Sequence, residues 1–144
     1  MAGPVVLEAI EPRDREACFA IRIDVFCDEQ NVSRDIEFDG LDDQCRHYLV
    51  TLDDAEIGTA RARPLNDREI KLERIAVRSE FRNTGIGRLL MVRVLSDAAR
   101  SGYECAVLNS QVQACPFYAK LGFEIEGEPF DEAGIPHRRM RRML

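Results

Sequence analysis

Hydrophobic and polar residues alternate along this chain with two different periods, which separate its expected strands from its expected helices. Short runs rich in β-branched and apolar residues, closed by turn residues, predict strands. Apolar residues that recur every three or four positions predict amphipathic helices. The expected strands are residues 5–10, 47–52, 56–63, 69–77, 103–108, 123–130 and 137–143; the expected helices are 13–29, 85–101 and 113–121; residues 31–43 suit either a short helix or a loop.

The order of these elements indicates a fold class. One strand and one or two helices precede three strands, a helix, a strand, a helix and a final pair of strands. This order predicts an α+β fold with a mixed seven-stranded sheet flanked by about four helices. No repeat or linker divides the 144 residues, so we expect a single domain over residues 1–144.

Composition excludes several classes of function. A net charge of −6 argues against nucleic acid as a partner, because a phosphate backbone requires a basic surface. No apolar run approaches the ~20 residues that cross a bilayer, and the first residues do not resemble a secretory signal. Five cysteines without CxxC spacing favour reduced thiols over disulfides or a metal site. We therefore expect a cytoplasmic protein with no metal and no membrane partner.

The stretch from Lys71 to Ser101 combines an expected strand, a turn with two glycines and an expected helix. Residues 82–87 read Arg-Asn-Thr-Gly-Ile-Gly. The first N–H groups of a helix have no partner inside it and carry partial positive charge, and glycine lets an anion approach the backbone. The turn has neither the Gly-Lys-Ser/Thr ending of a P-loop nor the three glycines of a dinucleotide fingerprint. It predicts an anion site of another kind.

This Arg-x-x-Gly-x-Gly turn resembles the pyrophosphate turn of the GNAT superfamily of acyl-CoA-dependent N-acetyltransferases. Residues 111–123 (QVQACPFYAKLGF) are similar to a second block of that family, Asn-x-x-Ala-x-x-Leu-Tyr-x-Lys-x-Gly-Phe. Phe117 stands where Leu is usual, and Gln111 stands where Asn is usual. The resemblance covers nearly the whole chain, and the matching positions of the second block are Ala114, Tyr118, Lys120, Gly122 and Phe123.

The resemblance implies the GNAT fold and transfer of an acetyl group from acetyl-CoA to a primary amine of a small molecule or peptide. It also implies that backbone groups of one strand pair with the pantetheine arm of the cofactor. For Arg88 the alternative is a solvated arginine without a role in binding. For Asn109 the alternative is a plain loop residue. The expected cofactor-binding residues are Ile75, Ala76, Val77, Arg82, Asn83, Thr84, Gly85, Ile86, Gly87, Arg88, Asn109 and Phe117.

Acyl transfer to an amine requires a neutral amine and a proton for the departing thiolate. The resemblance assigns the proton to Tyr118 as general acid; the alternative is a buried tyrosine without a role. Glu73 is the candidate base. Alternation would place it on one face with Ile75 and Val77, where apolar neighbours raise a carboxyl pKa. The alternative is an ion pair of Glu73 with Arg61 or Arg63 on the adjacent strand.

Residues 22–30, 37–39 and 133–137 resemble a small bacterial GNAT branch, the ElaA-like and YjcF-like proteins. On this basis Arg22, Glu29, His47 and His137 are expected to line the acceptor pocket. Their alternatives are an internal ion pair for the arginine and hydrogen-bonded core positions for the histidines. The acidic residues between 35 and 43 suit either attraction of a cationic amine or a solvated loop.

Two other functions stay open at this point. A non-catalytic acyl-CoA sensor would keep the cofactor site without turnover, and an acyl-transferring signal synthase shares the Arg-x-x-Val-Phe feature of the first expected helix. The exposed edge of the C-terminal hairpin also makes a homodimer an expectation.

Overall fold

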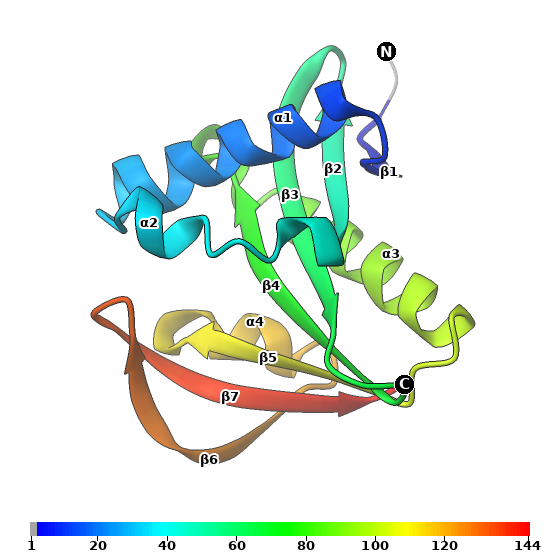
Figure 1. Cartoon of the computed structure of the whole chain (residues 1–144), viewed down its shortest axis with the longest axis vertical. Coiled ribbons are helices and arrows are strands. Elements are labelled where there is room, and N and C mark those ends of the chain that lie inside the picture. Colours follow the sequence, from blue (N-terminus) through cyan, green and yellow to red (C-terminus); the bar gives the residue numbers. More distant parts are fainter. Residues whose placement is uncertain (1–2) are drawn as a thin grey trace.

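The computed structural model describes residues 3–144, which form a seven-stranded sheet of order β1-β2-β3-β4-β5-β7-β6 (Figure 1). All neighbouring strands are antiparallel except β4 and β5, which are parallel. The mixed seven-stranded sheet expected from the sequence is therefore confirmed. The strands are β1 (Val5–Glu8), β2 (Arg46–Leu52), β3 (Ala55–Pro64), β4 (Glu69–Val77), β5 (Cys105–Gln111), β6 (Glu124–Glu132) and β7 (Ile135–Met143).

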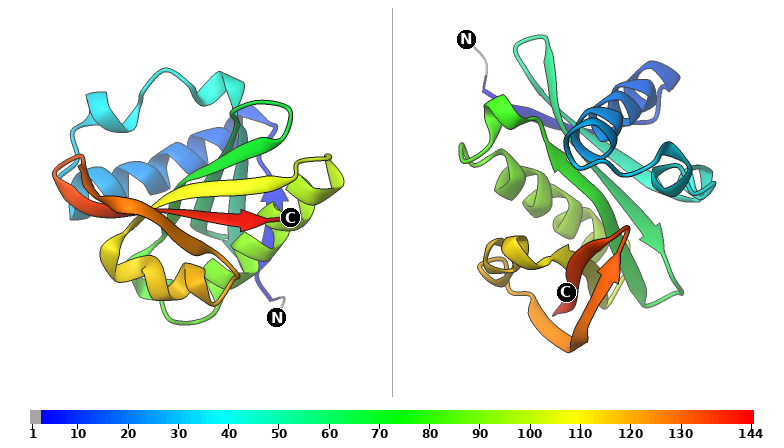
Figure 2. Two further views of the ribbon diagram at one scale, coloured as in Figure 1. Left: turned by 90° about the horizontal axis from the view of Figure 1, so that it is seen from below. Right: turned by 90° about the vertical axis from the view of Figure 1, so that its left-hand side faces the viewer.

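The four α-helices are α1 (Pro12–Arg22), α2 (Arg34–Glu37), α3 (Ile86–Arg100) and α4 (Cys115–Ala119). Helix α1 continues directly into a π-helical segment, Ile23–Glu29, so the expected helix over 13–29 is present with a wider final part. Figure 2 shows α1 and α3 on opposite faces of the sheet. No helix within residues 3–144 combines the length and the apolar character that a membrane span requires.

Two apolar clusters hold the helices to the sheet. On one face, Leu90, Met91 and Val94 of α3 are almost fully buried against the central strands. On the other face, Cys18 and Ile21 of α1 pack in a smaller cluster. The helical spacing of these apolar positions is the pattern that predicted both helices, because each helix buries one stripe.

The C-terminal hairpin closes more tightly than the sequence suggests. Its turn consists of Ala133 and Gly134, with φ angles of 53° and 75°. Positive φ at both central residues is the requirement of a type I′ turn, whose twist matches that of the flanking strands. Strand β6 forms an edge of the sheet, and pairing of two subunits through this edge stays a prediction.

Strands β4 and β5 separate halfway along their length. They pair from Glu69 to Leu72 on β4 and from Cys105 to Leu108 on β5, and no further. Beyond that point β4 stays paired with β3, and β5 stays paired with β7. The inner edges of the two strands therefore diverge, and their backbone groups on this side have no neighbouring strand.

A β-bulge lies on β4 where the strands diverge. Arg74 has a φ of 55°, and the register with β3 shifts between Thr59 and Arg61. The extra residue reverses the alternation of faces beyond it. Ile75 therefore packs with the α3 cluster, whereas Ala76 packs with the α1 cluster.

Candidate functional site

A cleft of about 670 Å³ occupies the space where β4 and β5 separate. Its walls come from the π-helical segment, α2, β4, β5, α4 and the turn between β6 and β7. Both faces of the sheet contribute, because the cleft passes between the two strands. The expected site residues that line it are Glu73, Ile75, Ala76, Val77, Arg82, Asn109, Tyr118 and His137.

The backbone amides of residues 83–88 have no acceptor within the described part of the chain. Helix α3 begins with Leu89 donating its N–H to the Gly85 carbonyl, and no side chain caps the helix. Asn83 and Gly85 have φ angles of 61° and 86°, which turn successive N–H groups toward one side. The turn is therefore a set of unused donors at the positive end of a helix.

Gly87 allows α4 to pack beside the start of α3. A Cβ atom at Gly87 would lie 3.2 Å from Cζ of Phe117, closer than a normal contact. Phe117 in turn contacts Tyr118 edge to face, with ring centroids 5.0 Å apart. The second glycine of the motif thus sets the distance between the anion turn and the tyrosine.

Tyr118 lines the cleft while its ring is buried against Phe117 and Phe123. Burial raises the pKa of its phenol, and the nearby Cys115 adds to the rise. No hydrogen bond within residues 3–144 uses the Tyr118 hydroxyl. The hydroxyl is therefore protonated near neutral pH and available to a ligand.

Arg82 and Glu29 are joined at the mouth of the cleft. Two guanidinium nitrogens of Arg82 contact the Glu29 carboxylate at 2.9 and 3.0 Å. Arg82 also donates from Nε to the Val77 carbonyl at 2.8 Å. Glu29 itself does not line the cleft, contrary to expectation, and is instead paired with Arg82, a candidate cofactor residue.

Three more polar residues from the family motifs or the expected cofactor site differ in exposure and in hydrogen-bond partners. Arg88 is exposed. Asn109 lines the cleft and donates from Nδ2 to Glu132 at 3.1 Å. Gln111, which departs from the usual asparagine, donates to Gln30 at the end of the π-helical segment. Gln111 therefore ties the two walls of the cleft together.

The expected face of Glu73 is wrong, because the bulge at Arg74 intervenes. Glu73 lies opposite Arg61 on β3, on the face away from Ile75. Its carboxylate contacts Arg63 at 2.7 Å, Arg61 at 3.2 Å and the Lys71 ammonium at 3.7 Å. Burial alone would raise the pKa of Glu73, but these cations outweigh burial and lower it. The expected rise in pKa is therefore also wrong.

Besides Glu29, two of the expected acceptor residues, Arg22 and His47, do not line the cleft. Arg22 is buried with its guanidinium over the rings of both Phe19 and Phe38, and it donates to Glu37 at 2.8 Å and to Asp42 at 2.8 Å. Arg22 therefore forms internal ion pairs, which is the alternative to an acceptor contact that the sequence left open.

His47 is likewise a core residue, with its ring edge to face against Phe19. Its Nε2 contacts the Asp42 carbonyl at 2.8 Å, and its Nδ1 is buried with no hydrogen-bond partner in the described part of the chain. Burial lowers the pKa of His47, so its neutral form is favoured.

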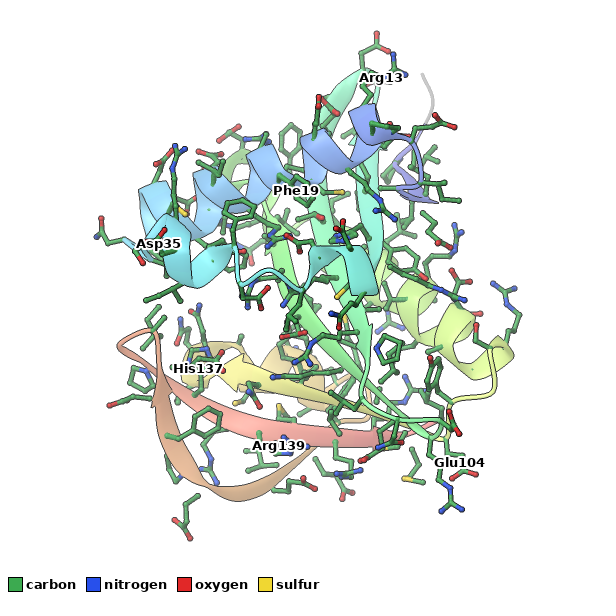
Figure 3. All side chains as sticks on the ribbon, viewed as in Figure 1. Arg13, Phe19, Asp35, Glu104, His137 and Arg139 are labelled. Atoms are coloured by element: carbon green, nitrogen blue, oxygen red, sulfur yellow. The ribbon has the colours of Figure 1, made fainter. Side chains whose placement is uncertain are left out.

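His137 does line the cleft, from β7 (Figure 3). Its Nδ1 lies 2.6 Å from the Ile135 carbonyl, and its ring stacks on Phe130 at 6.0 Å. Nε2 lies 3.6 Å from the Glu132 carboxylate. The histidine is thus oriented by its neighbours with one edge toward the cleft. Within residues 3–144, no group of three His, Cys, Asp or Glu side chains is arranged to hold a metal.

Sequence reasoning missed a network of charges between α2 and the sheet. Arg61 is fully buried and contacts Asp39 at 2.9 Å and Asp42 at 3.0 Å, while Arg74 contacts Glu37 and Asp39. The signal in the sequence was an acidic segment before a strand with arginines at alternate positions, 61 and 63. Only the tertiary structure brings them into contact.

Comparison with known proteins agrees with this geometry. The family model described as "Acetyltransferase (GNAT) domain" matches residues 14–144. The chain belongs to the GNAT acetyltransferase family. It is 38% identical to the uncharacterized N-acetyltransferase YjcF of Bacillus subtilis, over 86% of this chain and 89% of YjcF. It is 31% identical to the protein ElaA of Escherichia coli, over 88% of this chain and 85% of ElaA. The expected small bacterial branch is therefore confirmed.

Solved structures agree as well. A putative N-acetyltransferase from Lactobacillus plantarum superposes with a TM-score of 0.93 at 30% identity, covering 99% of both chains. A GNAT family acetyltransferase from Elizabethkingia anophelis with acetyl-CoA bound superposes with a TM-score of 0.76 at 20% identity over the whole of both chains, which shows a common fold. Family membership makes transfer of an acyl group the expected class of reaction.

Proposed function

We propose that this protein transfers the acetyl group of acetyl-CoA to a primary amine of a small molecule or peptide by direct attack of the amine. The observation that carries the proposal is the set of unused amides at residues 83–88, next to the cleft that Tyr118 lines. These donors suit a diphosphate, and Arg82 beside them adds charge. When bound, acetyl-CoA supplies an acyl thioester.

The divergent edge of β4 suits the extended arm of that molecule. The backbone of Ile75, Ala76 and Val77 lies beyond the last pair formed with β5. A pantetheine arm could take the place of the missing strand, since strand edges bind extended ligands through main-chain groups. The same edge would then hold the thioester close to the wall that contains Tyr118.

We propose Tyr118 as the general acid. Burial raises the pKa of Tyr118, so the proton stays on the hydroxyl until a thiolate develops. The hydroxyl, which has no hydrogen-bond partner within residues 3–144, can then donate this proton to the sulfur. The proton that the amine loses on attack passes to solvent, from which the hydroxyl regains its own. Glu73 is a weak proton acceptor because three cations lower its pKa, so it is not part of this proposal as a base. His137, with one edge toward the cleft, stays a candidate contact of the acceptor.

The test follows release of the CoA thiol from acetyl-CoA in the presence of a panel of primary amines. Tyr118→Phe should lower kcat by at least about 100-fold, since a general acid contributes 10²–10⁴. Its affinity for acetyl-CoA, measured by calorimetry, should stay within about twofold. Tyr103→Phe is the matched control, because Tyr103 packs against the α3 cluster away from the cleft and should not affect turnover.

Three outcomes would contradict parts of the proposal. Binding of acetyl-CoA without turnover of any amine would favour a sensor. Unchanged kcat in Tyr118→Phe would remove the tyrosine from the mechanism. Absence of affinity for any coenzyme A thioester would reject the whole assignment.

A further inference from the structure

The carboxylates of the cleft near α2 already have cationic partners. Glu37 contacts Arg22 and Arg74, and Asp39 contacts Arg61 and Arg74. Each carboxylate therefore has two arginines beside it before a ligand arrives. Paired in this way, they have little remaining capacity to attract a cationic acceptor.

Arg63 and Lys71 are in the opposite situation. They lie directly opposite each other on β3 and β4, and both line the cleft. Arg63 donates to Glu73 through Nε alone, at 2.7 Å, and the Lys71 ammonium stays 3.7 Å from the same carboxylate. A guanidinium carries five N–H donors and an ammonium three. Most of these donors have no acceptor among residues 3–144.

Glu73 cannot neutralise both cations. It also lies 3.2 Å from the buried Arg61, which is itself paired with Asp39 and Asp42. Within residues 3–144, Arg63 and Lys71 have no carboxylate partner other than Glu73. The side chains of Arg63 and Lys71 are only 23% and 18% exposed, so water replaces the missing acceptors incompletely. This part of the cleft therefore holds a local excess of positive charge with free hydrogen-bond donors.

We propose, on the basis of the proposed function, that the acceptor is a small amine that also carries an anionic group, a carboxylate or a phosphate, bound by Arg63 and Lys71. The Arg63 guanidinium lies at the Glu73 carboxylate, and Glu73 is two residues before Ile75 on β4. Two residues of chain span at most about 7 Å, so the anion site lies close to the strand edge proposed for the thioester arm, and the anion and the amine are separated by only a few bonds. The anionic group accepts hydrogen bonds from the donors of Arg63 and Lys71 that Glu73 leaves unused.

The experiment compares kcat/KM for matched acceptors at a fixed concentration of acetyl-CoA. The pairs are glycine and glycinamide, β-alanine and β-alaninamide, and O-phosphoethanolamine and ethanolamine. The anionic member of at least one pair should be preferred by roughly tenfold or more, the worth of a charge-assisted hydrogen bond. A preference within carboxylate pairs alone, or within the phosphate pair alone, identifies which anion binds.

The variants separate recognition from folding. Arg63→Gln and Lys71→Gln should each reduce the preference for the anionic member of a pair by about tenfold, and Arg63→Lys should retain part of this preference. Arg139→Gln is the matched control. Arg139 lies on β7, away from the cleft wall (Figure 3), and is paired with Glu126, so the preference should not change.

Turnover of neutral amines as fast as of their anionic partners would overturn this inference and leave the proposed function in place. Failure of every amine to release thiol would reject the proposed function instead. In that case, calorimetric titration of the CoA-bound protein with β-alanine and O-phosphoethanolamine tests whether Arg63 and Lys71 bind an anion. Heats that vanish in Arg63→Gln would support it, and no heats in the wild type would overturn it.

Discussion

At the turn of residues 82–88, the groups that a ligand can reach are mainly backbone amides, whereas near α2 they are charged side chains already bound to one another. The amides lie on a short segment and need no distant residue to be in place. The charges come from α1, α2, the following loop and two strands. The groups at one end of the cleft thus come from a single short segment, whereas those at the other end come from segments that are distant along the chain.

The comparison predicts opposite effects of mutation at the two ends. Changes near α2 should reduce stability, because buried charges lose their partners. Changes at the turn should reduce cofactor affinity at a smaller cost in stability, because the amide donors there are unused by the protein.

The largest expected effect is on Arg22, which is 1% exposed and pairs with Glu37, 4% exposed. Arg22→Met leaves a buried carboxylate without one of its two arginine partners and should lower the free energy of unfolding by about 3–5 kcal/mol. Chemical denaturation measures this loss. Arg139→Met, which breaks a partly exposed pair, should cost about 1 kcal/mol or less. Equal losses in the two variants would contradict the view that burial makes the α2 network sensitive.

Acid should also weaken the network of charges near α2. The hydrogen bond from Arg61 holds the pKa of Asp39 below its ordinary value, and the cations around Glu73 lower its pKa despite burial. Both carboxylates therefore contribute stability that is present above their ordinary pKa of about 4 and lost as pH falls below it. Glu37 acts in the opposite sense, because burial raises its pKa.

Unfolding experiments between about pH 5 and pH 3 should show stability falling as pH falls. Asp39→Asn should flatten this dependence, because the variant has one fewer carboxylate with a lowered pKa. A steeper or unchanged slope would show that Asp39 does not contribute. Near neutral pH, Asp39→Asn should still be less stable than the wild type.

At the turn, Gly85→Ala should weaken binding of acetyl-CoA by about tenfold, because a Cβ atom would obstruct the approach of a phosphate to the amides. The left-handed conformation of Gly85, with φ of 86°, adds a stability cost of about 1 kcal/mol. Gly102→Ala is the matched control, with φ of 93°, equally open surroundings and a place at the far end of α3. It should lose similar stability and keep its affinity.

The smallest expected effect is on Glu29, whose carboxylate holds the Arg82 guanidinium. Glu29→Gln frees this cation and removes a negative charge from the mouth of the cleft. Affinity for acetyl-CoA should rise by about two- to fivefold, as expected for a solvent-exposed ion pair. Asp24→Asn, which breaks the neighbouring pair with Arg78, serves as the control. Weaker binding in Glu29→Gln would mean that the pair positions Arg82 rather than restrains it.

The sequence alone determined the order of elements and the turn of residues 82–87 with its two glycines, and the family resemblance singled out Tyr118, which lines the cleft in the structure. Helical and strand periods depend on neighbours within a few residues, and the two glycines act through their own backbone. The tertiary structure alone decided the face of Glu73 and the burial of Arg22 and His47. A bulge at one residue reverses every later side chain of β4, and an ion pair forms between groups that are distant along the chain. Local patterns do not contain such contacts, because their energy depends on three-dimensional packing.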